Sequence, residues 1–122
     1  MEGYIKLGEI LVYRLSVELS DIGWVIYSQL GWQERKIFGD QYIRSIDSVG
    51  ANIAEGYGRF HYLDRIKFYY NARGSLFEAR HWNYIMMKRQ VVKDEQYKIF
   101  DNKCNLVSYQ LNLFIKSCYP QK

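Results

Sequence analysis

The sequence has few of the residues that break helices or cross-link chains. Its single proline, Pro120, stands near the end, and no run approaches the ~18 consecutive apolar residues that a membrane-spanning helix needs. Cys104 and Cys118 lie on one predicted helix, about 21 Å apart at ~1.5 Å per residue, which is too far for a disulfide. Charged residues near the start, Glu2 and Glu9 among them, interrupt any signal peptide. These absences predict a reduced, cytoplasmic protein without a membrane span.

What the sequence has instead is a regular spacing of apolar residues, which make up 48% of its 122 residues. Their intervals of three and four predict helices over about 8–30, 33–56, 61–90 and 95–117. Short connections between four helices predict an all-α fold, an antiparallel up-down four-helix bundle formed by one domain over 1–122. The residues predicted to face its core are Leu11, Leu15, Leu19, Ile22, Ile26 and Leu30; Phe38, Tyr42, Ser45, Val49 and Ile53; Phe68, Tyr69, Ala72, Leu76, Ala79, Met86 and Met87; and Phe100, Cys104, Val107, Leu111, Phe114 and Cys118.

Three of the predicted helices carry a second apolar row away from the core stripe. A four-helix monomer needs one apolar face per helix, and exposed apolar rows usually mark interfaces. We therefore predict self-association into a symmetric homo-oligomer. The second rows consist of Ile10, Tyr13, Val17 and Trp24; Ile66, Tyr70, Phe77 and Tyr84; and Ile99, Leu106 and Leu113.

The corner between the second and third helices combines glycines with small polar residues. We expect Gly56 and Gly58 to end one helix and turn the chain. Antiparallel pairing would bring polar residues of the two helices together, which predicts a structural network that fixes helix register. Arg59 lies four residues after Glu55 as a local partner. The network residues are Gln41, Asn52, Glu55, Ser75 and Glu78.

An enzymatic interpretation of the corner would use Glu55 and Glu78 as a carboxylate pair for acid–base chemistry or a metal. No histidine joins them at ligand spacing, and His61 and His81 project to different faces. Gly56-Tyr57-Gly58 is too short for a dinucleotide fingerprint and follows a helix. The interpretation that we favour is therefore structural, with no catalytic residue, no metal and no cofactor.

Positive charge is concentrated on the corner and the third helix, where only Asp64 and Glu78 offset it. The formal net charge of the chain is +4. One interpretation is a phosphate-contacting surface that a symmetric oligomer repeats, with Tyr57, Tyr62 and Tyr70 available for base stacking. The other is a solvated helix face with salt bridges between subunits. The cations are Arg59, Arg65, Lys67, Arg73, Arg80, His81, Lys88 and Arg89.

The stretch from Ser48 to Arg59, Ser-Val-Gly-Ala-Asn-Ile-Ala-Glu-Gly-Tyr-Gly-Arg, resembles the S-I-x-x-N-I-A-E-G-x-G-R motif of a known family. That family comprises the four-helix-bundle proteins encoded by intervening sequences in 23S ribosomal RNA genes. Gly74-Ser75-Leu76-Phe77-Glu78 resembles the family's following G-S-L-x-E element, and Gln41 and Arg44 fit the pattern before the corner. The resemblance is firm over about residues 38 to 80.

This resemblance implies an up-down four-helix bundle that assembles as a homopentamer. It also implies a relation to the accessory variability proteins of diversity-generating retroelements, which are basic pentameric bundles that bind nucleic acid and a reverse transcriptase. The chain departs from the family pattern at Leu11-Val12-Tyr13-Arg14, where another opening is usual. Arg65, Arg73 and Asn83 also replace apolar residues, which adds polar groups to the third helix.

The leading hypothesis from the sequence is a non-enzymatic, cytoplasmic, oligomeric bundle that binds nucleic acid, RNA rather than DNA, through the basic surface of the third helix. The competing hypothesis is a protein-interaction scaffold, for example an accessory subunit of a reverse transcriptase or a ribosomal component. A metalloenzyme or hydrolase that uses Glu55 and Glu78 ranks third.

Overall fold

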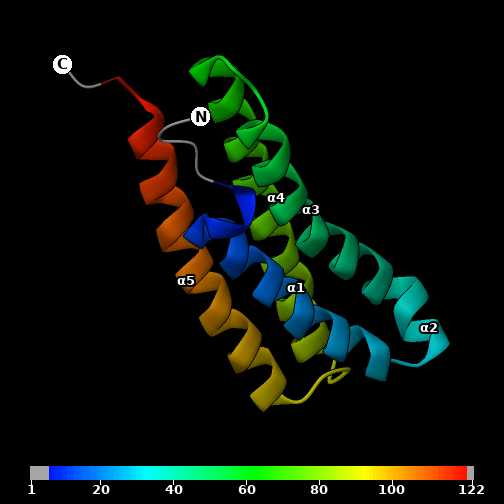
Figure 1. Ribbon diagram of the computed structural model, residues 1–122. Coiled ribbons are helices and arrows are strands. Elements are labelled where there is room, and N and C mark those ends of the chain that lie inside the picture. The colour runs from blue at the N-terminus through cyan, green and yellow to red at the C-terminus, as the bar shows by residue number, and fades with distance from the viewer. Residues whose placement is uncertain (1–5, 121–122) are drawn as a thin grey trace.

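The computed structural model describes residues 6–120, and this part of the chain is built from helices that lie side by side (Figure 1). The four long helices are α1 (Leu11–Gln29), α3 (Asp40–Tyr57), α4 (Tyr62–Lys88) and α5 (Asp94–Cys118). Shorter elements are the 3-10 turn η1 (Leu7–Glu9), the helical turn α2 (Trp32–Glu34) and the π-helical turn η2 (Arg35–Gly39). The prediction of an all-α, four-helix fold is confirmed over these residues.

The four long helices form a closed ring of contacts in the order α1, α3, α4, α5, with the most extensive contact between α3 and α4. The chain reverses its direction between successive long helices (Figure 1). The predicted second helix is observed as one helical path from Trp32 to Tyr57 that includes the π-helical turn. Residues 1–5 and 121–122 of the predicted domain, Glu2 included, lie outside the described residues. Within 6–120, no helix combines the length and apolar character that crossing a membrane requires.

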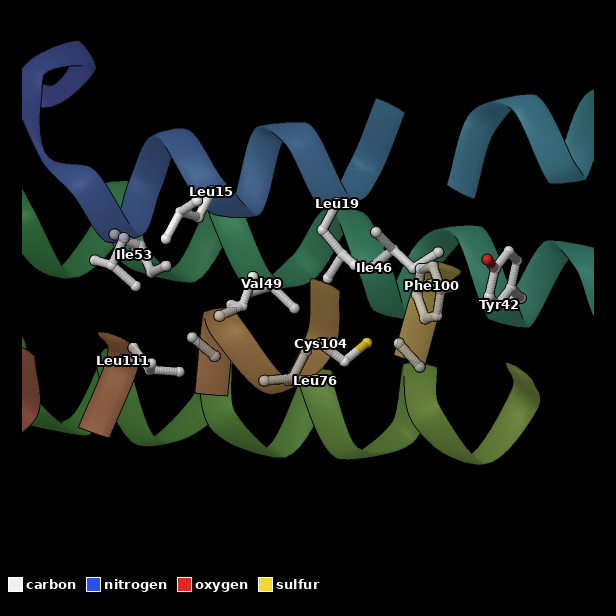
Figure 2. Packing of buried hydrophobic residues seen from close by; sticks show 14 of the residues in the cluster. Leu15, Leu19, Tyr42, Ile46, Val49, Ile53, Leu76, Phe100, Cys104 and Leu111 are labelled. Carbon is white, nitrogen blue, oxygen red and sulfur yellow. The ribbon is translucent and has the colours of Figure 1, made fainter. Parts of the chain in front are cut away.

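The interior of the ring is filled by one row of side chains from each long helix (Figure 2). Leu19 of α1, Ile46 of α3, Leu76 of α4 and Phe100 of α5 are almost completely buried and belong to one cluster. Most of the predicted core is confirmed, because an apolar residue every three or four positions keeps returning to the same side of a helix. Ile46 lay outside the predicted stripe.

The core prediction is wrong at Leu11, whose side chain is 45% exposed, whereas Ile10 and Val12 are buried. The chain enters through the 3-10 turn η1 and an extended Ile10, so α1 begins at Leu11 instead of near Gly8. Leu11 lies at seven-residue spacing from the exposed Glu18 and Val25, so it belongs to the row beside the buried stripe.

The corner glycine Gly56 is required by close packing between α3 and α4. An added Cβ at this position would lie 2.7 Å from Cε1 of Tyr69 and 3.0 Å from the carbonyl oxygen of Arg65. Gly58 follows α3 with φ −75° and ψ −8°, an ordinary right-handed conformation. Gly58 thus ends α3 as expected, but it does so without a left-handed backbone conformation. Gly56 is needed because it lets two helices approach.

Candidate nucleic-acid interface

The eight cationic residues predicted from the sequence wind around α4 instead of sharing one face. An α-helix places successive residues about 100° apart, so positions 65 and 67 face other directions than positions 73 and 80, which share one side. Arg73 and Arg80 lie toward α5, where they contact Asn112 and Asp101. Arg59 lies on the opposite flank, at the end of α3, with its guanidinium carbon 4.8 Å from the ring centre of Phe68.

Three of these cations already have polar partners within the described chain. Arg59 pairs with Glu55 at 2.7 Å, and Arg80 pairs with Asp101 at 3.0 Å. Arg73 donates to the side-chain oxygen of Asn112 at 3.2 Å. The pairs of Arg59 and Arg80 neutralise charge locally, so these arginines contribute less to an anion-binding surface than the sequence predicts.

Two more cations are held against the bundle. Arg65 is half-buried, and its Nε has no hydrogen-bond partner in residues 6–120. Arg89, just past the end of α4, lies over the ring of Phe38 at 5.4 Å. Lys67, His81 and Lys88, by contrast, are exposed and form no ion pair among the described residues.

These three exposed cations belong to a regular seam on the outer side of α4. Its members alternate at intervals of three and four, all are exposed, and the intervening row at seven-residue spacing is aromatic. We call this set the aromatic seam: Lys67, Tyr70, Gly74, Phe77, His81, Tyr84 and Lys88. Sequence reasoning found both halves separately, as a cation set and as an apolar row, but did not combine them. The three-four spacing from 67 to 88 was the available signal.

The rings of the seam lie beside positive charge. The Arg73 guanidinium carbon lies 4.8 Å from the ring centre of Tyr70, and the Lys88 ammonium lies 5.9 Å from that of Tyr84. Phe77, 62% exposed, is the most exposed of the three aromatic rings. Tyr70 also hydrogen bonds through its hydroxyl to that of Tyr119, the residue that follows α5, at 3.1 Å, and this bond raises the pKa of Tyr119.

The predicted polar network is not formed within the described part of one protomer. Asn52 donates to the carbonyl oxygen of Ser48, Gln41 donates to that of Ile37, and Glu55 accepts from Arg59. Glu78 accepts a hydrogen bond from the Trp82 indole at 3.3 Å. Each of these bonds joins residues four positions apart along the chain, so none of them links α3 to α4. Ser75, the fifth predicted member, is half-buried.

The same arrangement separates the two carboxylates of the enzymatic interpretation, since Glu55 and Glu78 each bond to a different neighbour. Among residues 6–120, no three His, Cys, Asp or Glu side chains come together as a metal site. Burial raises the pKa of the Cys104 thiol to about 12 and also raises that of Cys118, which keeps both thiols protonated at neutral pH. His61 accepts from the backbone N–H of Leu63 and so serves as the N-cap of α4.

A second exposed surface is aliphatic and lies along α1 and α5. Leu11, Glu18 and Val25 repeat every seven residues on α1, and Glu18 pairs with Lys103 of α5, so this row faces α5. Val25 shares a shallow groove with Ile99. We call the exposed apolar members the aliphatic strip: Leu11, Val25, Ile99, Leu106 and Leu113, each between 43% and 56% exposed.

The second apolar rows predicted from the sequence are thus largely exposed in a single protomer. Val17 and Trp24 of α1 are exposed, as are three residues on α4 and three on α5. Ile10 and Ile66 are exceptions because both are buried. What these surfaces share is that a single copy of the chain leaves them open to solvent.

The fold and the surface together define a class: an all-α, basic four-helix protein that is distinguished by its exposed aromatic seam and aliphatic strip. The model of the 23S rRNA-intervening sequence protein family matches residues 8–113, and the chain belongs to this family. No curated protein sequence matches it.

A solved structure supports the fold independently. The chain is similar to a protein of unknown function from the S23 ribosomal protein family of Bacteroides thetaiotaomicron, whose crystal structure was determined at 1.70 Å. The TM-score is 0.81 at 24% sequence identity, and the match covers 87% of this chain and 96% of that one. At this identity the likeness shows the fold.

Proposed function

We propose that this chain is a non-enzymatic, cytoplasmic, homo-oligomeric bundle that binds RNA through the outer side of α4. The observation that carries the proposal is the pair of exposed lysines Lys67 and Lys88, with His81 between them, none of which forms an ion pair in the described residues. Unpaired exposed cations on one side of a helix are suited to phosphate contact. RNA is proposed over DNA because the family's name associates it with intervening sequences of 23S rRNA.

Oligomerisation is part of the same proposal. The aliphatic strip on α1 and α5 supports docking between copies, and the family resemblance implies five of them. A ring of copies would repeat the weak cationic surface of each α4 and convert single contacts into multivalent binding. The strip lies along α1 and α5 and the seam along α4, so the two are separate surfaces of one protomer.

The proposal is tested by RNA binding as a function of salt, followed by fluorescence anisotropy. Two phosphate contacts per copy predict about tenfold weaker binding at 200 mM than at 50 mM salt. The variant Lys67→Glu/Lys88→Glu should lose most of the affinity, whereas Lys36→Glu, an exposed lysine at η2, should change it little. Binding that is insensitive to salt, or equal losses in the two variants, would refute a phosphate-led mechanism.

The second candidate is a protein-interaction scaffold, such as an accessory subunit for a reverse transcriptase or a ribosomal component. The aliphatic strip favours it, because exposed apolar side chains whose neighbouring charges, Glu18 and Lys103, pair with each other are suited to the core of a protein interface. Stoichiometric co-purification with one protein that resists nuclease, together with an absence of RNA binding, would support this candidate over the first.

A further inference from the structure

We propose that the aromatic seam of α4 is a stacking platform for single-stranded RNA. The inference rests on the proposed RNA-binding function and specifies the form of the ligand. Cations alone would serve a duplex equally well, since every duplex presents phosphates. The seam adds exposed aromatic rings, and only unpaired bases offer their flat faces to such rings.

The first observation is the composition of the seam. One of its two rows contains only rings, Tyr70, Phe77 and Tyr84, which are 40%, 62% and 46% exposed. The other row carries Lys67, His81 and Lys88. The two rows alternate along the helix, so Tyr70 and Tyr84 each have a lysine one turn away. Phe77 has Arg73 and Arg80 one turn before and after it. Aromatic rings interleaved with positive charge are what sequence-tolerant binding of single strands requires.

The second observation is Gly74, which lies in the other row between the levels of Tyr70 and Phe77. A Cβ added there would meet no atom within 4 Å, so the packing of the bundle does not require glycine. Glycine in the middle of a 27-residue helix is unfavourable relative to alanine. Its absent side chain leaves the helix surface flat beside the rings, which suits the close approach of a planar base.

The third observation is the charge around the seam. Two exposed carboxylates of α4 lie at one edge of the seam: Glu78, which accepts a hydrogen bond from Trp82, and Asp64, three residues before Lys67. They are outnumbered by Lys67, Arg73 and Lys88. On the other flank Arg73 lies against Tyr70. The seam therefore complements an anion. Docking of two copies through the same seam would oppose like charges, which is unfavourable.

The length of the seam sets the size of the ligand. From Lys67 to Lys88 the helix rises about 31 Å at ~1.5 Å per residue, which corresponds to about nine nucleotides at ~3.4 Å each. Successive rings are about 10 Å apart along the helix axis. A single strand of about ten nucleotides is therefore the shortest probe that spans the seam.

The test compares an unstructured twelve-nucleotide RNA with the duplex that it forms with its complement, by fluorescence anisotropy on the full chain. We expect tighter binding of the single strand. Phe77→Leu, which removes the ring and keeps an apolar side chain, should weaken single-strand binding about fivefold or more. Phe77→Trp should retain the affinity. Trp24→Ala is the matched control, because Trp24 is 59% exposed on α1, across the bundle from α4.

A stacking contact has a readout that a phosphate contact lacks. Phe77→Leu should leave the slope of log affinity against log salt unchanged, whereas Lys67→Ala should lower it by about 0.7 for a single strand. Gly74→Leu, which covers the flat site with a side chain that the fold has room for, should also weaken binding. Phe77→Leu and Gly74→Leu should both keep the helix content and the mass of the wild-type protein.

Other outcomes would overturn the inference in distinguishable ways. If the protein bound the single strand and the duplex equally, and Phe77→Leu had no more effect than Trp24→Ala, the stacking platform would be refuted. Salt-dependent RNA binding would still stand. A change in mass on Phe77→Leu would assign the seam to contact between copies. Tighter binding of poly-L-glutamate than of RNA, lost in Phe77→Leu, would assign it to an acidic protein partner. Failure of both RNA forms to bind at low salt would refute the RNA-binding function itself.

Discussion

The substitution of Leu106 and Leu113 by aspartate should dissociate the oligomer while leaving the bundle folded. The two side chains are 43% and 46% exposed, and neither lies in the buried cluster of the protomer. Complete burial of a leucine is worth about 2 kcal/mol, so each side chain has about 0.9 kcal/mol still to release on docking. Loss of both lowers the association constant of a contact about 20-fold.

Aspartate adds a second effect, because a buried and unpaired carboxylate costs several kcal/mol more. The combined loss should convert an assembly that persists at micromolar concentration into single subunits. Sedimentation velocity and light scattering would measure the mass, and circular dichroism would confirm helix content. The matched control is Asn105→Asp/Asn112→Asp, which adds the same charge at the same seven-residue spacing on exposed positions of α5, on the side where Asn112 contacts Arg73 of α4.

The reasoning would be refuted by two results. A Leu106→Asp/Leu113→Asp variant that keeps the wild-type mass would show that the strip is not a contact between copies. An equal loss of mass in the control variant would show that added charge, and not lost apolar contact, is responsible. The fold itself is not at stake in either case, since these side chains remain substantially exposed in the protomer.

Three further predictions concern the interior. Gly56→Ala should lower the free energy of unfolding by about 1–3 kcal/mol, because the new methyl group overlaps Tyr69 and the Arg65 carbonyl; a urea midpoint equal to wild type would contradict this close approach. Tyr42→Phe should raise the free energy of unfolding by about 1 kcal/mol, since the buried Tyr42 hydroxyl has no protein partner in the described residues. A lower midpoint of thermal unfolding in this variant would show that the hydroxyl is hydrogen bonded. Burial raises the pKa of Cys104 from 9.0 to about 12, so its contribution to stability is complete below pH 9 and is lost as pH rises toward 12. Urea midpoints measured from about pH 8 to about pH 10.5 should therefore fall, and less steeply in Cys104→Ala; a constant midpoint would refute the linkage.

Much of the fold could be predicted because helical periodicity is local. Val49 and Ile53 recur on the face that α3 buries, and the same pattern placed Leu76 and Leu111 correctly. The ends of the helices were less predictable. The structure ends α4 at Lys88, and Gln90 adopts φ 60° just after it. No residue type in this stretch signals that the helix stops at Lys88 instead of at Gln90.

The candidate site was predictable in composition but not in arrangement. The sequence shows that α4 is rich in cations, but only the structure shows that Arg80 pairs with Asp101 across 21 positions of sequence. The polar network failed for a similar reason. Asn52 and Glu78 satisfy their hydrogen bonds within their own helices, a choice that depends on the side-chain directions at the α3–α4 contact.

Asn83 illustrates where sequence and structure agree on an irregularity. The sequence has a polar residue at a position of α4 where the family resemblance implies an apolar one. The structure buries Asn83 almost completely, with its amide donating to the Tyr97 carbonyl and its own oxygen without a partner in the described residues. A buried half-satisfied amide lowers stability, which identifies Asn83 as a specific departure of this chain from a simple apolar core.

The account as a whole depends on copies that dock through apolar surface and so combine their positive charge for RNA. Native mass spectrometry of the wild-type protein, purified without nuclease, tests this most directly. We predict an assembly whose mass is a multiple of the 14.6 kDa subunit, with additional mass that ribonuclease removes. A single 14.6 kDa species at micromolar concentration, free of RNA, would contradict it.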